Sequence, residues 1–189
     1  MADIIKKDIH LALIHYPVYN KIGEVVTSSV TTLDIHDISR TARTFAVKNF
    51  YVVTPLKTQR QLVERLIDHW MTGYGAEYNP TRKEALLSTC VANNLKEALR
   101  DLTKRCGQKP VTVATGAKRF PKSIEFRLMR EKIRTGEPVL LLFGTGWGLE
   151  KNIIKEADYV LDPIKGVGEY NHLPVRAAIA IVLDRLIAR

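Results

Sequence analysis

The fold of this chain is decided by the stretch Pro138-Val-Leu-Leu-Leu-Phe143, which runs directly into Gly144-Thr-Gly-Trp-Gly-Leu149. A second stretch repeats the arrangement: Tyr159-Val-Leu-Asp162 runs into Pro163-Ile-Lys-Gly-Val-Gly-Glu-Tyr-Asn-His-Leu-Pro-Val175. Each places an apolar strand immediately before a loop that contains glycine. Glycine lets the backbone turn sharply and lets a ligand approach the main chain without a Cβ in the way. We therefore expect the two loops to line one site for a small nucleotide-like cofactor.

The pattern Gly144-x-Gly146-x-Gly148 also resembles the loop of dinucleotide-binding folds, and Asp162 follows near the ~20-residue spacing of a ribose-binding acid. Its position argues against that fold, because there the loop follows the first strand and several strand–helix units come after it. Here only residues 149–189 follow, enough for a helix, a strand and a helix. A nicotinamide-dependent enzyme stays an alternative, and so does a tight turn that binds nothing.

The composition is typical of one globular domain over residues 1–189, with 46% of the residues hydrophobic and 26% charged. No apolar run approaches the ~20 residues of a membrane-spanning helix, and residues 1–8 lack the pattern of a secretory signal. We therefore expect a cytoplasmic protein without membrane association. Cys90 and Cys106 lie far apart in the sequence, and neither has a histidine at metal-ligand spacing. We expect reduced, mostly structural thiols and no metal site.

The net charge is +9, from 29 Lys and Arg against 20 Asp and Glu. Such an excess favours a polyanionic partner, because basic side chains release counterions from a phosphate backbone. Basic residues gather within 118–122 and 127–134. A solvated helix face would have the same composition, so the charge alone selects no partner.

Apolar strands alternate with helices along most of the chain. The sequence predicts three strands before the two already named, over residues 9–15, 50–53 and 111–114. It predicts helices over residues 33–47, 59–72, 94–105, 123–134 and 173–188, and a loop after residue 73 that runs through Asn79-Pro80. This alternation predicts an α/β fold, with a mostly parallel sheet and helices on both of its faces.

Two of the predicted helices bear on function. In the first, one apolar stripe contains Ile35, Ile38, Ala42, Phe45 and Ala46. Arg40 lies nearly opposite that stripe, so it faces water, a partner subunit or an anionic ligand. The last helix is apolar nearly all round from Val175 to Ile187 and needs a cover on both sides. We therefore expect a homodimer that buries this C-terminal helix.

Three separated stretches carry a more specific pattern. The first is Asp34-Ile-His-Asp-Ile-Ser-Arg-Thr-Ala-Arg-Thr-Phe45, the second Leu142-Phe-Gly-Thr-Gly-Trp-Gly-Leu149, and the third Asp162-Pro-Ile-Lys-Gly166 through Asn171-His-Leu-Pro-Val-Arg-Ala-Ala178. These stretches resemble the SPOUT class of RNA methyltransferases. The resemblance is strongest to small, uncharacterised bacterial proteins that are tRNA methyltransferase-like, whose chains share His15-Tyr-Pro17, Gly144-Thr-Gly-Trp-Gly-Leu149 and Asn171-His-Leu173.

This resemblance implies a C-terminal trefoil knot, S-adenosylmethionine (SAM) as the cofactor, and RNA, specifically tRNA, as the substrate. It assigns the cofactor contacts to Thr115, Gly116, Gly144, Thr145, Gly146, Trp147, Gly148, Asp162, Ile164, Tyr170, Asn171 and Leu173. Arg40 would stabilise a developing negative charge or grip a phosphate of the RNA. Asn171 would cap the last helix and orient the methionine end of the cofactor. Gly146→Val should abolish cofactor binding and leave the fold largely intact, because the new side chain would enter the space of the ligand.

The chain departs from the ribose-methylating branch of that class at two positions. Asp34 stands where that branch has Asn, and Pro174 where it usually has Ser. These changes leave methylation of the ribose or of the base open. They also permit a regulator that binds SAM without catalysis.

Overall fold

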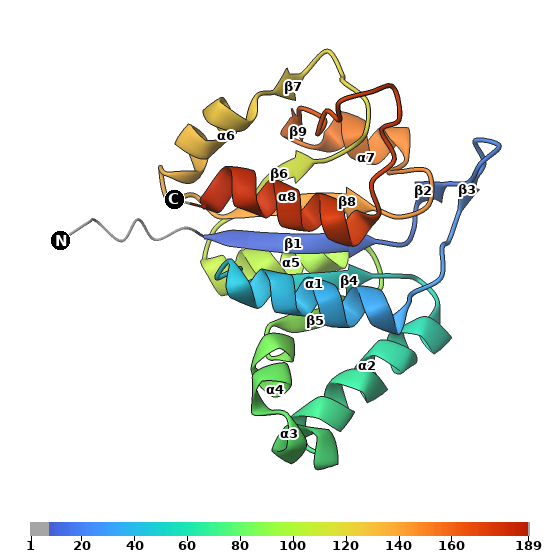
Figure 1. The fold of residues 1–189 in the computed structure, drawn as a ribbon, viewed down its shortest axis with the longest axis vertical. Coiled ribbons are helices and arrows are strands. Elements are labelled where there is room, and N and C mark those ends of the chain that lie inside the picture. Colours follow the sequence, from blue (N-terminus) through green and yellow to red (C-terminus); the bar gives the residue numbers. More distant parts are fainter. Residues whose placement is uncertain (1–7, 189) are drawn as a thin grey trace.

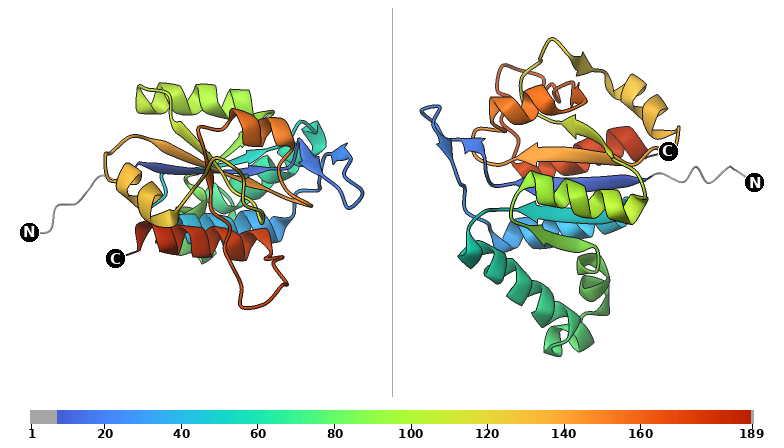
Figure 2. Two further views of the ribbon diagram at one scale, coloured as in Figure 1. Left: turned by 90° about the horizontal axis from the view of Figure 1, so that it is seen from above. Right: turned by 180° about the vertical axis from the view of Figure 1, so that it is seen from behind.

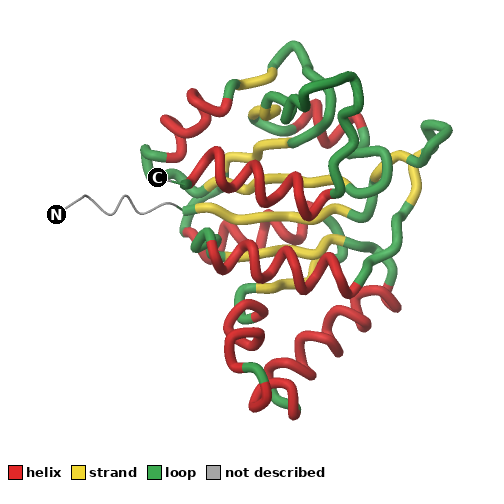
Figure 3. Tube along the Cα trace, viewed as in Figure 1, coloured by secondary structure: helices red, strands yellow, loops and turns green. Residues whose placement is uncertain are grey.

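The computed structural model describes residues 8–188, in which seven strands form one parallel sheet of order β5-β4-β1-β8-β6-β9-β7 (Figures 1 and 3). These strands are β1 (Ile9–Ile14), β4 (Asn49–Val53), β5 (Thr89–Ala92), β6 (Val111–Ala114), β7 (Ser123–Ile124), β8 (Val139–Gly144) and β9 (Tyr159–Leu161). A separate antiparallel pair, β2 (Val18–Tyr19) and β3 (Val25–Val26), projects as a hairpin beyond the end of β1.

Helices cover both faces of the sheet, as Figure 2 shows in its edge-on view. The helices are α1 (Thr32–Thr44), α2 (Lys57–Met71), α3 (Tyr74–Tyr78), α4 (Pro80–Leu86), α5 (Leu95–Cys106), α6 (Phe126–Ile133), α7 (Lys151–Glu156) and α8 (Val175–Ile187). Leu11 and Leu13 of β1 pack into the core beneath α1 and α8, whereas Ala12 and Ile14 pack into the core beneath α5 and α7. Alternate strand residues thus supply two separate cores, which confirms the predicted α/β fold.

The first helix is shorter than predicted. Thr31 caps it, because its hydroxyl accepts a hydrogen bond from Asp34 N at 3.1 Å. The helix ends at Thr44, and Ala46 has a φ of 55° and is exposed. The predicted apolar stripe holds for Ile35, Ile38 and Ala42, which are buried, but it does not extend to Ala46.

The segment from residue 73 to 92 was predicted less well. Where a loop was expected, α3 and α4 form two short helices that connect α2 to β5 and lie beyond that edge strand. Asn79 begins α4, because its side chain accepts a hydrogen bond from Arg82 N, and Pro80 at the first helical position is compatible with a helix start. These elements are too short for a periodic pattern to reveal them.

The last helix buries only part of its apolar surface within the chain. Ile179, Val182, Leu183 and Leu186 are buried against the sheet and its neighbours. Ala177, Ala178, Ala180 and Ile181 are only half-buried. Within residues 8–188, no helix is long and apolar enough to cross a membrane.

Candidate cofactor and substrate site

The three predicted cofactor-binding loops, which follow β6, β8 and β9, leave neighbouring strands at the same edge of the sheet. β8, β6 and β9 are adjacent and parallel, so their carboxyl ends lie at one edge of the sheet (Figure 1). Gly144 is the last residue of β8, and Thr115 and Asp162 directly follow β6 and β9. Thr115 is fixed there because its N–H and hydroxyl both donate to Leu142 O, at 3.0 and 2.9 Å. The carboxyl edge of a parallel sheet is where such folds bind ligands.

The loop after β8 is a tight turn that requires its glycines for backbone reasons. A Cβ on Gly144 would lie 2.6 Å from Leu149 N, so any side chain would open the turn. Gly146 has a φ of 57°, and a Cβ there would lie 2.8 Å from Tyr19 O. The expectation that Gly146→Val would leave the fold largely intact is therefore wrong, because its Cβ would meet the β2 backbone.

The β2–β3 hairpin holds this turn from outside. Trp147 N donates to Tyr19 O at 2.9 Å, and Tyr19 N donates to Gly148 O at 3.0 Å. Trp147 N–H and Gly148 C=O are thus already hydrogen-bonded to β2. The Trp147 side chain is 61% exposed at the edge of the site. An exposed indole next to a ligand loop is suited to stacking on a flat partner.

A buried chain of polar side chains lies below the turn. His15, which follows β1, is fully buried, and its Nδ1 lies 3.0 Å from Ser28 Oγ. Ser28 Oγ makes a short hydrogen bond to Thr145 Oγ1, and Thr145 Oγ1 also donates to Ile14 O at 3.2 Å. Among residues 8–188, no group forms a hydrogen bond with His15 Nε2. Burial lowers the pKa of His15 to about 4, so the ring is neutral at physiological pH.

This polar chain was not predicted. The sequence predicts His15 only as the end of the first strand and as part of the resemblance. It predicts no role for Ser28. The signal was present at the end of β1, where the polar residue His15 follows a fully buried strand.

The segment after β9 crosses to the loop after β6. Asn171 Nδ2 donates to Ala117 O at 3.0 Å, which joins the two loops. Asn171 does not cap α8, contrary to the prediction: the N-cap is Pro174, and no side chain caps the helix there. Ile164 packs against the core, whereas Tyr170 and Leu173 are exposed, as is Gly116 in the other loop.

Asp162 presents an unsatisfied oxygen to this region. Its Oδ1 atom is buried and accepts no aligned hydrogen bond from any residue between 8 and 188. Arg119, from the loop after β6, places its Nε 3.3 Å from that oxygen, and the Arg119 side chain is 64% exposed. A buried acceptor paired only with an exposed guanidinium is available to a ligand donor.

The α1 helix lies next to α8 (Figure 1). Its residue Arg40 is exposed. Within the described part of the chain, the Arg40 side chain makes no ion pair or hydrogen bond. Arg43, one turn further, is instead paired with Glu84 of α4. Arg176 of α8 binds two acids of α1: its Nε lies 3.3 Å from Asp34 Oδ1 and its Nη1 lies 2.9 Å from Asp37 Oδ2. The predicted position of Arg40 off its own core is therefore confirmed.

Comparison with known proteins identifies a family that this chain matches. Residues 8–188 match a family described as SAM-dependent RNA methyltransferase. An uncharacterized protein of Aquifex aeolicus is 38% identical over 187 residues, which are 98% of this chain and 91% of that protein. A tRNA (guanine-N(1)-)-methyltransferase of Oleidesulfovibrio alaskensis is 41% identical over 96% of this chain, but the match covers only 42% of that longer protein.

Solved structures share the fold at low identity. A TrmH/SpoU tRNA modifying enzyme of Aquifex aeolicus superposes with a TM-score of 0.56 at 16% identity, over 95% of this chain and 74% of that one. The SpoU methyltransferase AviRb of Streptomyces viridochromogenes, solved in complex with the cofactor AdoMet, superposes with a TM-score of 0.58 at 16% identity, over 96% of this chain and 60% of that one.

Proposed function

Because the chain belongs to the family of SAM-dependent RNA methyltransferases, we propose that it methylates tRNA at the edge where the loops after β6, β8 and β9 meet. The observation that carries this proposal is that the loops at Thr115, Gly144 and Asp162 meet one edge of the sheet through three adjacent parallel strands. The α1 helix, which contacts α8, carries Arg40, which is unpaired within residues 8–188. The family excludes the nicotinamide-dependent alternative.

The residues at this edge fit SAM. The loop from Gly116 to Arg119 is exposed and offers main-chain N–H and C=O groups to an adenine, while Asp162 Oδ1 is an acceptor without a hydrogen bond. When bound, SAM supplies an electrophilic methyl group on a sulfonium. Thr145 and Gly148 hold the turn that faces it, and Asn171 holds the segment after β9 against Ala117. Fixed loops of this kind align two reactants, which supplies much of the rate of a displacement.

We also propose that this end of the chain forms the predicted trefoil knot. β9 lies between β6 and β7 in the sheet, and residues 115–122 connect those two strands. The chain that leaves β9 must therefore pass this connection to reach α8, which packs on the α1 face. Its contact from Asn171 to Ala117 is compatible with a passage through the loop.

Arg40 is proposed to act on the RNA. A hydroxyl or ring nitrogen that attacks a methyl group needs its charge stabilised or its neighbouring phosphate held, and a planar guanidinium can do either. Arg40 is exposed and lies on α1, which Arg176 fixes against α8. The α8 helix directly follows the segment proposed to bind the cofactor. The net charge of +9 favours the approach of a polyanion. Ribose and base remain alternative targets.

The proposal also includes the oligomeric state, the RNA substrate and the cellular location. The half-buried outer face of α8 would be covered by a second copy in a homodimer of single-domain chains. The choice of tRNA rests on the names of two relatives that are more than twice as long as the match. Such an enzyme would act in the cytoplasm, where its substrate is found.

The deciding experiment compares tRNA from cells with and without the gene by nucleoside mass spectrometry. We expect one methylated nucleoside to disappear and to return when purified protein and SAM are added to the unmodified tRNA. Binding of SAM without transfer to any RNA pool would overturn the catalytic proposal and favour the regulator. Transfer to ribosomal RNA alone would overturn only the choice of tRNA.

A further inference from the structure

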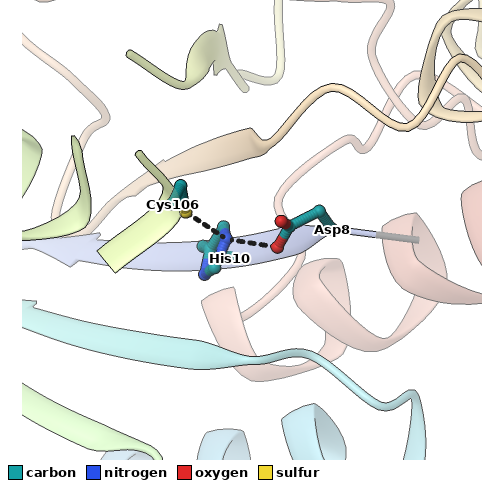
Figure 4. Close-up of side chains that lie close together, drawn as sticks. All are labelled: Asp8, His10 and Cys106. Carbon is teal, nitrogen blue, oxygen red and sulfur yellow. Dashed lines mark hydrogen bonds and ion pairs between the residues drawn. The ribbon is translucent and has the colours of Figure 1, made fainter. Parts of the chain in front are cut away.

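Three potential metal ligands meet at the edge of the sheet opposite the candidate methyltransferase site. Asp8 precedes β1, His10 is its second residue and Cys106 ends α5, and Figure 4 shows the three side chains converging. His10 Nε2 lies 2.8 Å from Asp8 Oδ1 and 3.6 Å from Cys106 Sγ. The three ligand atoms all lie within 4.8 Å of one another.

These distances suit a tetrahedral ion. Zinc binds sulfur at ~2.3 Å, imidazole nitrogen at ~2.0 Å and carboxylate oxygen at ~2.0 Å, so its ligand atoms lie roughly 3.3–3.6 Å apart. The Sγ–Nε2 distance of 3.6 Å already falls at that spacing, and the Nε2–Oδ1 pair needs to open by only some tenths of an ångström. A set of thiolate, imidazole and carboxylate selects zinc over magnesium or calcium, which prefer oxygen alone.

The cluster is not satisfied by its own hydrogen bonds. Asp8 Oδ1 is buried, and no donor within residues 8–188 forms an aligned hydrogen bond with it, although His10 Nε2 lies at contact distance. His10 itself is only 1% exposed. A carboxylate oxygen, an imidazole nitrogen and a thiol sulfur gathered at one point are ligands that a single cation could bind in place of their protons.

A second layer orients the histidine. The Asn49 side-chain amide lies 3.0 Å from His10 Nδ1, so the opposite nitrogen, Nε2, faces Asp8 and Cys106. A metal-bound Nε2 requires a proton on Nδ1, and the amide oxygen of Asn49 can accept it after a half-turn of the amide.

One cation already competes for the carboxylate. Lys48 Nζ lies 2.9 Å from Asp8 Oδ1, and its side chain is 45% exposed. Because it reaches in from solvent, its ammonium can swing out when a divalent ion binds. Lys48 therefore weakens the site without blocking it.

We propose that Asp8, His10 and Cys106 form a zinc site with three protein ligands and a fourth position for water. The sequence showed no such site, because Cys106 and His10 are 96 positions apart and meet only through the packing of α5 on the sheet. The site joins the start of β1 to the end of α5, at the amino ends of the parallel strands, whereas Thr115 and Gly144 lie at their carboxyl ends. Its role is therefore to stabilise the fold, and it does not depend on the proposed methyl transfer.

The test uses the full chain after removal of metals with a chelator, and cobalt(II) as the spectroscopic probe. We expect about one cobalt per chain, with a thiolate-to-cobalt charge-transfer band and the strong visible bands of four-coordination. Cys106→Ser should lose the charge-transfer band. Cys90→Ser is the matched control, because Cys90 is the other free cysteine and lines a separate cavity of about 380 Å³ between β5 and α5. It should keep the band.

Two further measurements separate a specific site from loose binding. Zinc, displacing cobalt, should raise the Tm of the wild type and not that of Cys106→Ser, and magnesium should raise neither. Lys48→Met should tighten zinc binding, since it removes the competing ammonium. Failure of the wild type to bind zinc at micromolar concentration would overturn the proposal, and so would a charge-transfer band that Cys106→Ser retains and Cys90→Ser loses.

Discussion

Arg176 Nε, in the first turn of α8, lies 3.3 Å from Asp34 Oδ1, in the first turn of α1. The Asp34 side chain is 15% exposed, and Thr31 Oγ1 donates a hydrogen bond to its other oxygen at 2.7 Å. Asp34 is the position at which the chain departs from the Asn of the ribose-methylating branch. The structure supplies a physical reason for the acid, because its charge is balanced by a guanidinium that also binds Asp37. The pair fixes the helix of Arg40 to the helix that follows the proposed cofactor segment.

Arg176→Ala should therefore weaken both stability and methyl transfer. Loss of a half-buried ion pair with two acids should lower the free energy of unfolding by about 1–2 kcal/mol. The displacement of α1 should lower kcat/KM by roughly 10- to 100-fold. Urea unfolding and initial rates measure the two effects. Arg127→Ala is the control, because its pair with Glu131 is exposed, and it should change neither. Equal activity of Arg176→Ala and wild type would show that the pair positions nothing.

Gly146→Val should destabilise the fold rather than block the ligand alone. The residue has a φ of 57°, and its Cβ would lie 2.8 Å from Tyr19 O, so the β2–β3 hairpin must move. A loss of about 2–4 kcal/mol in unfolding free energy is expected from backbone strain and the clash together. Gly166→Ala is the control, because its nearest neighbour, Tyr170 O, is 3.4 Å away and its φ is not positive. A Gly146→Val protein as stable as the wild type that fails to bind SAM would restore the original expectation.

Stability should fall in weak acid because of His15. Its folded pKa of about 4 lies below the ordinary value of 6.5, so the unfolded chain binds a proton that the native ring does not. The stabilising effect of a neutral ring is present above pH 6.5 and is lost as the pH falls toward 4, at a cost of up to about 3 kcal/mol. Urea unfolding at several pH values, compared with His15→Asn, isolates this contribution. His15→Asn should show a shallower decline between pH 6.5 and 4, and parallel curves would contradict the assignment.

The local pattern of hydrophobic residues predicts much of the fold, but it does not predict much of the candidate site. The apolar runs of β1 and β8 and the helix periodicity predicted the parallel sheet and its coverage. β5, with the sequence Thr89-Cys-Val-Ala92, and the two-residue β7 were missed, because they are short and become strands only beside β4 and β9. Local pattern also cannot give the order of the strands.

The same distinction holds for the candidate site. The glycines after β8 and the acid after β9 predicted that the two loops would meet, because parallel strands end at one edge. Sequence could not show that a Cβ on Gly146 would meet Tyr19, or that Ser28 would bridge His15 and Thr145, since those contacts depend on how the β2–β3 hairpin folds back. Contacts between segments distant in sequence are set by the whole fold.

The half-buried face of α8 predicts a dimer. Ile181→Asp, on that face, should dissociate the homodimer, because a carboxylate cannot be buried between two apolar helices without a partner. Sedimentation at micromolar concentration measures the change. Leu62→Asp is the control, since Leu62 is a 45% exposed apolar residue on α2, away from α8, and should leave the dimer intact. A wild-type chain that sediments as a monomer would refute the prediction.

Arg40→Ala should abolish most methyl transfer and leave SAM binding close to that of the wild type. Loss of a group that stabilises developing charge or holds the RNA costs roughly 10²- to 10³-fold in rate. Arg40→Lys should restore little, because an ammonium lacks the planar fork. Arg43→Ala is the matched control, because Arg43 lies on the same helix and is already paired with Glu84. Single-turnover rates with tRNA and equilibrium binding of SAM separate the two steps. If Arg40→Ala loses SAM binding as well, Arg40 acts on the cofactor, and the RNA must be held by other residues.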